Sequence, residues 1–384
     1  MVATKTKSNG SLDWILLGAT MALIATGLML LYSATSDLGY REYGDSAYFF
    51  RRQLVWLGIG LVAAFVAIQF PYRYLTKLSI PIMAATILLL LGLVIFGQGR
   101  LLIGQSVSPV ELAKLAMVIY IAHWLSSKSE VLGELPYGLL PFTIMVGVIA
   151  GLVMAQPDIS EALVIVLVSL AMFFLAGADL IQFVIGLLGG TGAFVLVITR
   201  LPHAMERLNG YMSEIRDPLH STNLQLSQGL FSLGSGGLFG FGAGSGRMKY
   251  QWLPAAHTDS IFAIAGEELG LVGCLFIIGL FALIAIRGLR IATLAPDSFG
   301  RLLASGVTCW IVFQALINMS VVTGTIPFTG IALPFISVGG SSLVTCMTGV
   351  GIMLSVSRTI GSEAQPSTEE SRWRRTSAPE REAA

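Results

Sequence analysis

Long runs of apolar residues recur along the whole chain, and short polar stretches separate them. A helix needs roughly 20 apolar residues to cross the hydrocarbon core of a bilayer. The runs that approach this length are 14–33, 53–70, 77–96, 109–125, 138–155, 159–177, 180–199, 259–286, 301–322 and 333–357. The pattern predicts an all-α polytopic membrane protein of about ten transmembrane helices.

The composition fits a membrane environment. Apolar residues make up 54% of the chain and charged residues only 12%, whereas soluble domains average about 25% charged residues. The formal net charge of +1 gives no strong electrostatic attraction to nucleic acid, so no nucleic-acid partner is expected. Cys274, Cys309 and Cys346 lie inside apolar runs without CxxC spacing, which favours buried packing residues over a disulfide framework or a zinc site.

The distribution of positive charge predicts the orientation. An even number of spans places both termini on one side, and Lys and Arg prefer cytoplasmic segments. With the N-terminus cytoplasmic, the inner segments hold Lys5, Lys7, Arg73, Lys77, Lys128, Arg287, Arg290, Arg301 and Arg358. The short outer loops hold only Arg41, Arg51, Arg52 and Arg100. We therefore predict that the N-terminus and the C-terminus are both cytoplasmic.

This topology divides the chain into three parts. Residues 1–13 form a cytoplasmic N-terminal tail, and residues 14–358 form the transmembrane domain. Residues 359–384 are rich in Ser, Glu, Pro and Arg, so we expect a disordered cytoplasmic tail, because such a composition cannot bury a core.

One extracytoplasmic loop, about 200–258, lies between the seventh and eighth spans and is far longer than the others. Loops of this length are usually functional or disordered. Because disorder would not need the aromatic residues of this loop, we expect it to be partly ordered and to rest on the membrane surface. Its glycine-rich run, 234–246, lacks the patterns of nucleotide-binding loops. The run indicates flexible backbone close to a bulky ligand rather than an ATPase.

The densest polar cluster runs from Lys249 to Asp259, directly into the eighth span. Pro254 should end any preceding helix, which leaves Thr258 or Asp259 to cap the next one. Asp259 could be only a cap, or a carboxylate at the mouth of an outward cavity that acts as a general base. The residues alone leave both readings open. His257 could tune Asp259, bind substrate or be exposed.

Two further pairs of charges lie within the spans. Glu267 and Glu268 follow Asp259 by about two turns, roughly 12 Å, where ionisable residues face a bundle interior or a wet cavity. Adjacent helix positions point about 100° apart, so Glu267 and Glu268 can hardly serve the same role. The alternative to a functional role is a buried structural pair between one of them and Lys114 or an arginine. Glu111 and Lys114, three residues apart, can pair with each other, or Lys114 could face a pyrophosphate. Pro109 suits the start of their helix.

Two polar segments interrupt the apolar pattern on the outer side. Gln156-Pro157-Asp158 predicts a turn with a helix cap, followed by Glu161 one turn later. The segment 325–342 contains two prolines and three glycines. Broken backbone at membrane depth is tolerated only where it lines a cavity or is buried in protein, so this segment is predicted to form one wall of the site.

Four of these clusters, in this order, resemble motifs of the SEDS family (shape, elongation, division and sporulation) of the RodA/FtsW type. SPVELAKL at 108–115 looks like the family's QPSELAKL, and QPDISEA at 156–162 looks like QPDLGTA. LPAAHTDSIFA at 253–263, followed by GEELG at 266–270, looks like LPEAHTDFIFA with GEELG. LPFISVGGSS at 333–342 looks like LPFISYGGSS.

The resemblance covers most of the chain, from Trp14 to Arg358. The sequences of the motifs are closer to the FtsW (division) branch than to the RodA (elongation) branch. The chain departs from the family pattern at Ser108, Val110, Ser160, Glu161, Ala255, Ser260 and Val338. None of these departures removes Asp259, Glu111, Lys114 or Asp158.

The resemblance implies a peptidoglycan glycosyltransferase that polymerises lipid II at the outer face of the bacterial cytoplasmic (inner) membrane, for division or elongation. Asp259 would be the catalytic residue. The substrate-binding candidates are Glu111, Lys114, Asp158, Gln225, Lys249, His257, Ser337 and Ser341. Glu267 and Glu268 would be structural or cavity polar groups. No metal ligand set is predicted, although Lys114 or a divalent cation (Mg or Mn) could stabilise the pyrophosphate charge.

The implied partners are lipid II, the undecaprenyl-linked glycan strand, a class B penicillin-binding protein that supplies transpeptidase activity, and other division or elongation proteins. Two other functions stay open. One is a lipid II flippase or transporter without chemistry, in which Glu267, Glu268 and Lys114 would line a translocation path. The other is a non-catalytic scaffold of the division machinery.

Overall fold

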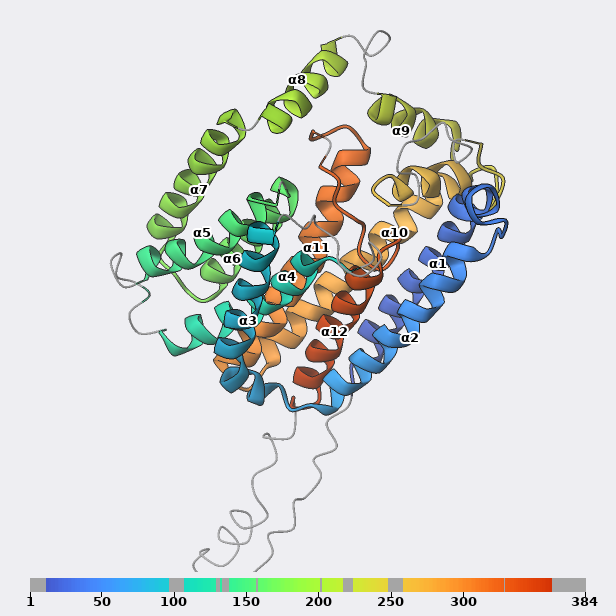
Figure 1. Ribbon diagram of the computed structural model, residues 1–384. Helices are drawn as coiled ribbons and strands as arrows, with labels where there is room; N and C mark the ends of the chain where they lie inside the picture. The colour runs from blue at the N-terminus through green and yellow to red at the C-terminus, as the bar shows by residue number, and fades with distance from the viewer. Residues whose placement is uncertain are drawn as a thin grey trace, which may run out of the picture.

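The computed structural model describes residues 12–96, 107–128, 132, 138–156, 158–200, 202–216, 224–247, 258–327 and 329–360. The regular structure of these residues is helical (Figure 1). The helices are α1 (Trp14–Tyr43), α2 (Tyr48–Gln69), the 3-10 helix η1 (Tyr72–Tyr74), α3 (Leu75–Phe96), α4 (Pro109–Ser127), α5 (Leu139–Met154), α6 (Ile159–Leu175), α7 (Leu180–Arg200), α8 (Pro202–Arg216), α9 (Leu224–Ser235), α10 (Ile261–Leu294), α11 (Ser298–Val322) and α12 (Gly340–Ser357).

Each of the ten apolar runs forms a helix, which confirms the predicted all-α polytopic fold. Eight of the helices are long and apolar enough to cross a membrane, and α5 and α6 are shorter apolar helices. The last run is helical only from Gly340, because Pro334 and the left-handed backbone at Phe335 (φ 66°) interrupt it. Residues 333–339 instead form turns against the bundle.

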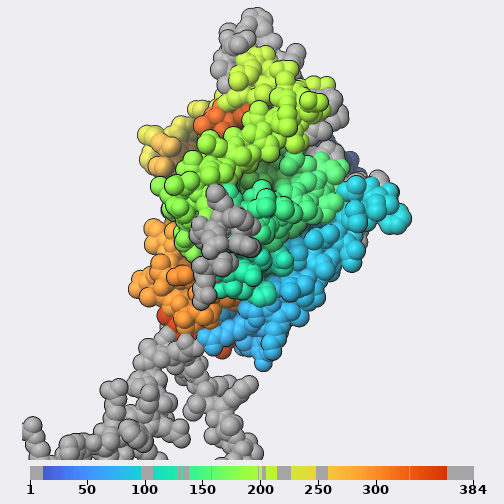
Figure 2. Space-filling view, turned by 90° about the vertical axis from the view of Figure 1, so that its left-hand side faces the viewer, coloured from blue at the N-terminus to red at the C-terminus, as the bar shows by residue number. Residues whose placement is uncertain are grey.

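The helices at the centre of the bundle bury most of their surface, whereas those at its edge expose apolar side chains. α11 and α12 are almost wholly buried, and α2 runs alongside α12. On α7 the residues that face outward include Ile181 (65% exposed) and Leu188 (67%). Helices that are apolar on their outer face fit a lipid surround. Figure 2 shows α7 continuing into α8 across this side of the molecule.

The long segment between α7 and α10 contains α8, α9 and the turns that follow them. This outcome confirms that the segment is partly ordered. α8 and α9 lie at the top of the bundle in Figure 1, and α12 ends at the bottom. The described ends of the chain meet at that bottom end, where Leu12, Trp14, Ser357 and Ile360 line one pocket. An even number of spans requires this arrangement. Residues 1–11 and 361–384, including most of the predicted C-terminal tail, lie outside the described residues.

Asp297 fixes the junction of α10, α11 and η1. Its Oδ1 caps α11 by accepting from the Gly300 N–H (2.7 Å), and its Oδ2 accepts from the Tyr72 hydroxyl (2.6 Å) and from Arg73 Nε (3.1 Å). Partial burial by itself would raise the pKa of this carboxyl. The hydrogen bonds from Tyr72, Gly300 and Arg73 outweigh that effect and hold the pKa of Asp297 below its usual value.

We predict that Asp297→Asn lowers the Tm of the purified protein at pH 7, because asparagine keeps the cap but loses the charge that pairs with Arg73. A depressed pKa stabilises the fold above the unfolded pKa of about 3.9 and ceases to do so as pH falls through the folded value. The Tm difference from the parent protein should therefore disappear at acidic pH. Asp179→Asn is the matched control, because Asp179 also accepts from a first-turn N–H, that of Ile181, and the described residues give it no ion pair. A difference that persists or grows at acidic pH would contradict this account.

Candidate active site

A cavity of about 500 Å³ opens at the end of the bundle where α10 begins. Its volume lies in the range of small-molecule sites. The start of α2, the first turns of α4, α6 and α12, the turn before α10 and the segment around Gly330 supply the lining. The lining residues are Phe49, Arg52, Gln53, Trp56, Ser108, Glu111, Asp158, Glu161, Thr258, Asp259, Gly330, Ala332, Val338, Gly339, Gly340, Ser341 and Ser342.

Four helices have their N-termini at this cavity. Ser108, Asp158 and Gly339 are the N-cap residues of α4, α6 and α12, and Asp259 lies two residues before α10. The first N–H groups of a helix have no partner within the helix, and the helix dipole places partial positive charge there. These helix ends place partial positive charge, together with Arg52, in a cavity whose wall also holds the carboxyl groups of Glu111, Asp158, Glu161 and Asp259.

Asp259 is half-buried in the turn Thr258–Ser260, and its side chain lines the cavity. The backbone of this turn is held from two sides. Asn318 Nδ2 donates to the Asp259 carbonyl (2.9 Å), and Ser337 Oγ donates to the Thr258 carbonyl (2.6 Å). The position of the Asp259 turn is therefore set by α11 and by the segment before α12.

The capping role predicted for Thr258 or Asp259 is wrong. Ser260 occupies the N-cap position of α10 and makes no side-chain capping bond to the helix. Because Asn318 and Ser337 hold residues 258 and 259 in a turn, helical geometry begins only at Ile261. Asp259 lines the cavity, and its Oδ2 lies next to Gly330 on the cavity wall.

Lys114 lies beside the cavity in a buried cluster that joins α4, α6 and α11. Its ammonium is 2.9 Å from Glu111 Oε2 and 2.8 Å from Glu161 Oε2, and it donates to Gln314 Oε1 (2.7 Å). The predicted Glu111–Lys114 pair is confirmed, and Glu161 adds a second carboxylate. The ammonium is therefore surrounded by three oxygen atoms, one in a hydrogen bond and two in ion pairs.

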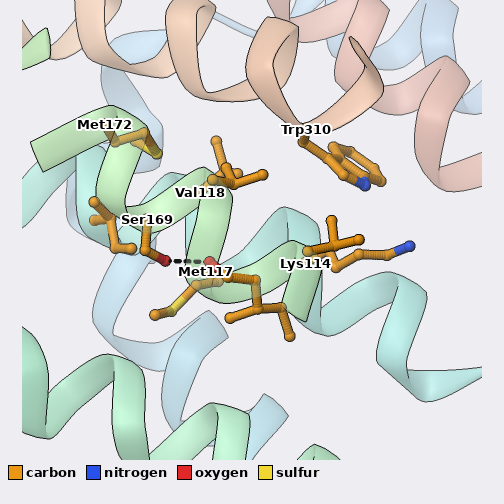
Figure 3. A pocket seen from close by; sticks show the side chains of 10 residues that line it. Lys114, Met117, Val118, Ser169, Met172 and Trp310 are labelled. Carbon is orange, nitrogen blue, oxygen red and sulfur yellow. Dashed lines mark hydrogen bonds between the residues drawn. The ribbon is translucent and has the colours of Figure 1, made fainter. Parts of the chain in front are cut away.

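Lys114 itself is only 2% exposed and does not line the cavity, whereas Glu111 and Glu161 do. Its ammonium lies 5.7 Å from the centre of the Trp310 ring. Figure 3 shows Lys114 and Trp310 together, next to Met117, Val118, Ser169 and Met172. The void between these residues is about 10 Å³, so it holds at most about one water molecule.

Glu267 and Glu268 hold the glycine-rich segment 236–247, which we call the glycine latch. Glu268 accepts from the N–H groups of Gly244 (2.9 Å) and Gly246 (3.3 Å), and Glu267 accepts from the Arg247 N–H (2.7 Å). Glu267 and Glu268 therefore share one role, which corrects the expectation that adjacent positions could hardly do so. Both side chains bind the same glycine latch. Neither of them lines the cavity.

The latch also replaces helical hydrogen bonds of α10, which is broken at Gly270 (φ 67°). The N–H groups of Leu271 and Val272 donate to Gly237 and Leu238, and those of Phe241 and Gly242 donate to the carbonyls of Glu267 and Glu268. A Cβ on Gly240 would lie 2.2 Å from the Glu268 carbonyl oxygen. Glycine therefore allows backbone to meet backbone here, rather than supplying flexibility near a ligand.

The remaining substrate-binding candidates differ in whether they line the cavity. Asp158 and Ser341 line the cavity, and Ser341 Oγ also accepts from the Ser108 N–H (2.9 Å). Ser337 instead supports the backbone of the Asp259 turn. Gln225 lies in α9, and its side chain is outside the described residues, as are the whole of Lys249 and His257.

Arg52, Gln53 and Trp56 of α2 line the cavity, although no motif indicated them. The available signal was topological, because Arg51 and Arg52 stand at the same end of the predicted bundle as Asp259. In the described part of the chain, no three or more His, Cys, Asp or Glu side chains are grouped so that they could hold a metal ion.

We predict that Lys114→Met destabilises the purified protein by about 3–5 kcal/mol, because it leaves two buried carboxylates without their cation. Thermal unfolding in detergent measures the change. The double variant Lys114→Met with Glu161→Gln should recover part of the loss, since it removes one of the stranded charges. A normally folded Lys114→Met protein that has lost only activity would show that the lysine acts on substrate instead.

The fold and the cavity define a class: a polytopic α-helical membrane protein with a polar cavity at one end of the bundle. Known proteins share this architecture. The structure is similar to that of Thermus thermophilus rod shape determining protein RodA (TM-score 0.66, 27% identity, 91% of this chain and 98% of that one). It is also similar to a chain from a structure described as structural coordination of polymerization and crosslinking by a peptidoglycan synthase complex (TM-score 0.70, 28% identity, 91% and 99%).

The sequence comparisons agree. The family model for FtsW, RodA and SpoVE, described as cell cycle protein, matches residues 13–361. The chain is 36% identical to a probable peptidoglycan glycosyltransferase FtsW of Trichlorobacter lovleyi, over 90% of this chain and 93% of that protein. It is 38% identical to stage V sporulation protein E of Bacillus subtilis, over 92% and 99%. The chain belongs to the FtsW/RodA/SpoVE family and is a multi-pass membrane protein.

Proposed function

We propose that this protein is a peptidoglycan glycosyltransferase that polymerises lipid II, with Asp259 as its general base. The observation that carries the proposal is the placement of Asp259 on the wall of a cavity of about 500 Å³ that Arg52 also lines and at which four helix N-termini converge. Membership of a family with curated peptidoglycan glycosyltransferases supports the same reaction.

The reaction joins an acceptor to a growing strand. The acceptor is lipid II, whose GlcNAc 4-hydroxyl lies next to Asp259. Asp259 takes the hydroxyl proton as the oxygen forms a bond to the anomeric carbon of the strand. The bond from that carbon to the pyrophosphate oxygen breaks, and undecaprenyl pyrophosphate leaves with the electron pair.

The leaving pyrophosphate needs positive charge nearby. The motifs suggested Lys114 as the source of that charge, but the geometry favours other groups. Lys114 is neutralised by Glu111 and Glu161, and it does not line the cavity. Arg52 does line it, and so do the first residues of α4, α6 and α12. We assign stabilisation of the pyrophosphate to Arg52 and to these helix N-termini, which act on charge that develops in the transition state.

The proposed location of the protein is the bacterial cytoplasmic membrane. Both termini lie in the cytoplasm, and the cavity opens at the outer face. The positive charges of the predicted inner segments support this orientation. A class B penicillin-binding protein is the proposed partner, supported by the structural similarity to a chain from a complex that coordinates polymerization and crosslinking.

A flippase is the alternative function. It would use Glu267, Glu268 and Lys114 along a translocation path, but each of these side chains is engaged with the glycine latch or with the buried cluster. The geometry therefore favours glycosyl transfer.

We predict that Asp259→Asn folds and inserts normally but polymerises purified lipid II about 10²–10⁴-fold more slowly, because asparagine cannot take the hydroxyl proton. The measurement is the rate of glycan formation by the purified protein. Asp297→Asn, the same change at the other end of the bundle, is the control for general effects and should retain activity after correction for its folded fraction. Near-normal polymerisation by folded Asp259→Asn would remove the catalytic assignment.

Cysteine labelling tests the orientation. Ser213 in α8 and Ser298 at the start of α11 are both exposed and lie near opposite ends of the bundle. An impermeant thiol reagent should label Ser213→Cys in intact cells and Ser298→Cys only after permeabilisation. The parent protein gives the background, and two of its native cysteines, Cys274 and Cys346, are buried. The reverse labelling pattern would invert the topology and place Asp259 on the wrong side for this reaction.

A further inference from the structure

A second polar pocket lies at the end of the bundle opposite the Asp259 cavity. Its volume is about 340 Å³, and it is formed by the start of α1, the last turns of α10 and the end of α12. Its lining includes Trp14, Arg287, Arg290, Leu294 and Ser357. The proposed polymerase chemistry does not use any of these residues.

The pocket contains two arginines, Arg287 and Arg290. Among the described residues, Arg287 is paired with a carboxylate, and Arg290 is not. Asp13, which also caps α1, accepts from Arg287 Nη2 (2.6 Å) and Nε (3.0 Å). Arg290 lies three residues further along α10 on the rim of the same pocket and is exposed. Within the described part of the chain no carboxylate forms an ion pair with Arg290. The two arginines and Asp13 leave a net charge of +1 in the pocket.

The depth of Arg290 places this charge among lipid headgroups. After the break at Gly270, the 20 residues from Leu271 to Arg290 extend α10 by about 30 Å at 1.5 Å per residue, roughly the thickness of the hydrocarbon core of a bilayer. The break at Gly270 and Arg290 therefore lie near opposite membrane surfaces. The rim of the pocket is apolar, with Trp14 68%, Ile15 49% and Leu294 51% exposed, and tryptophan is enriched at this depth.

We propose that this pocket binds the phosphate headgroup of an anionic phospholipid such as phosphatidylglycerol. Arg290 contacts the phosphate, while the Asp13–Arg287 pair forms the polar floor, and the acyl chains run along Ile15 and Leu294. Basic pockets between transmembrane helices at the cytoplasmic surface favour anionic lipids, and the proposed orientation places this pocket at that surface. This proposal does not depend on glycosyl transfer. If the pocket does not bind the lipid, the proposed function is unaffected.

Thermal unfolding of the full-length protein in a neutral detergent tests the site. Phosphatidylglycerol is titrated as a mole fraction of the micelle, with phosphatidylcholine as the zwitterionic lipid and sodium phosphate as the free anion. The test variant is Arg290→Gln. Arg301→Gln is the matched control, because Arg301 is an exposed arginine at the same end of the bundle, outside the pocket. Both variants lose one positive charge, so a general attraction between micelle and protein changes equally. Arg290→Lys keeps the charge.

Phosphatidylglycerol should raise the Tm of the parent protein, of Arg301→Gln and of Arg290→Lys. For Arg290→Gln the half-saturating mole fraction should be about fivefold higher, the loss expected for one arginine next to an anionic headgroup. Phosphatidylcholine and sodium phosphate should not reproduce the stabilisation. Equal responses of Arg290→Gln and Arg301→Gln would overturn the proposal. Stabilisation by sodium phosphate alone would also overturn it, because the site would then bind free anions rather than a lipid.

Discussion

One buried ammonium group, that of Lys114, ties together the three helices that carry much of the cavity wall. Glu111 and Lys114 come from α4, Glu161 from α6, and Gln314 from α11. A charge at this depth is tolerated only when it is paired, so the three helices cannot move apart without exposing an uncompensated ion. Because Glu111 and Glu161 also line the cavity, the requirement for charge pairing fixes the position of that wall.

The turn that carries Asp259 is also fixed by polar side chains. Asn318 and Ser337 each bond both to this turn and to the segment before α12. Asn318 and Ser337 hold its backbone, and the glycine latch secures the following part of α10 through Glu267, Glu268 and the break at Gly270. A broken helix within a membrane must satisfy its free backbone groups internally, and the latch does so. As a result, the turn that carries Asp259 is held in place next to helix N-termini, and preorganisation of this kind is what the proposed reaction needs.

The helices could be predicted from the sequence because crossing a bilayer requires a long run of apolar residues, and the apolar runs are visible directly in the sequence. The Glu111–Lys114 pair could also be predicted from the sequence, because the two residues lie three positions apart on one helix. Glu161 as a partner of Lys114 and Arg52 in the cavity depend on how distant helices pack, which local spacing does not encode. The latch illustrates the same limit. Its glycines indicated unusual backbone, but their partners lie on α10, more than twenty residues further along the chain.

The most direct test of the account is the action of the purified, full-length protein on fluorescent lipid II in liposomes. Gel analysis of the products and a leaflet-accessibility assay are applied to the same sample, with and without the transpeptidase partner. The account predicts glycan polymer that disappears when the lipid II substrate lacks a free GlcNAc 4-hydroxyl. Transfer of lipid II between leaflets without any polymer, in either condition, would contradict it.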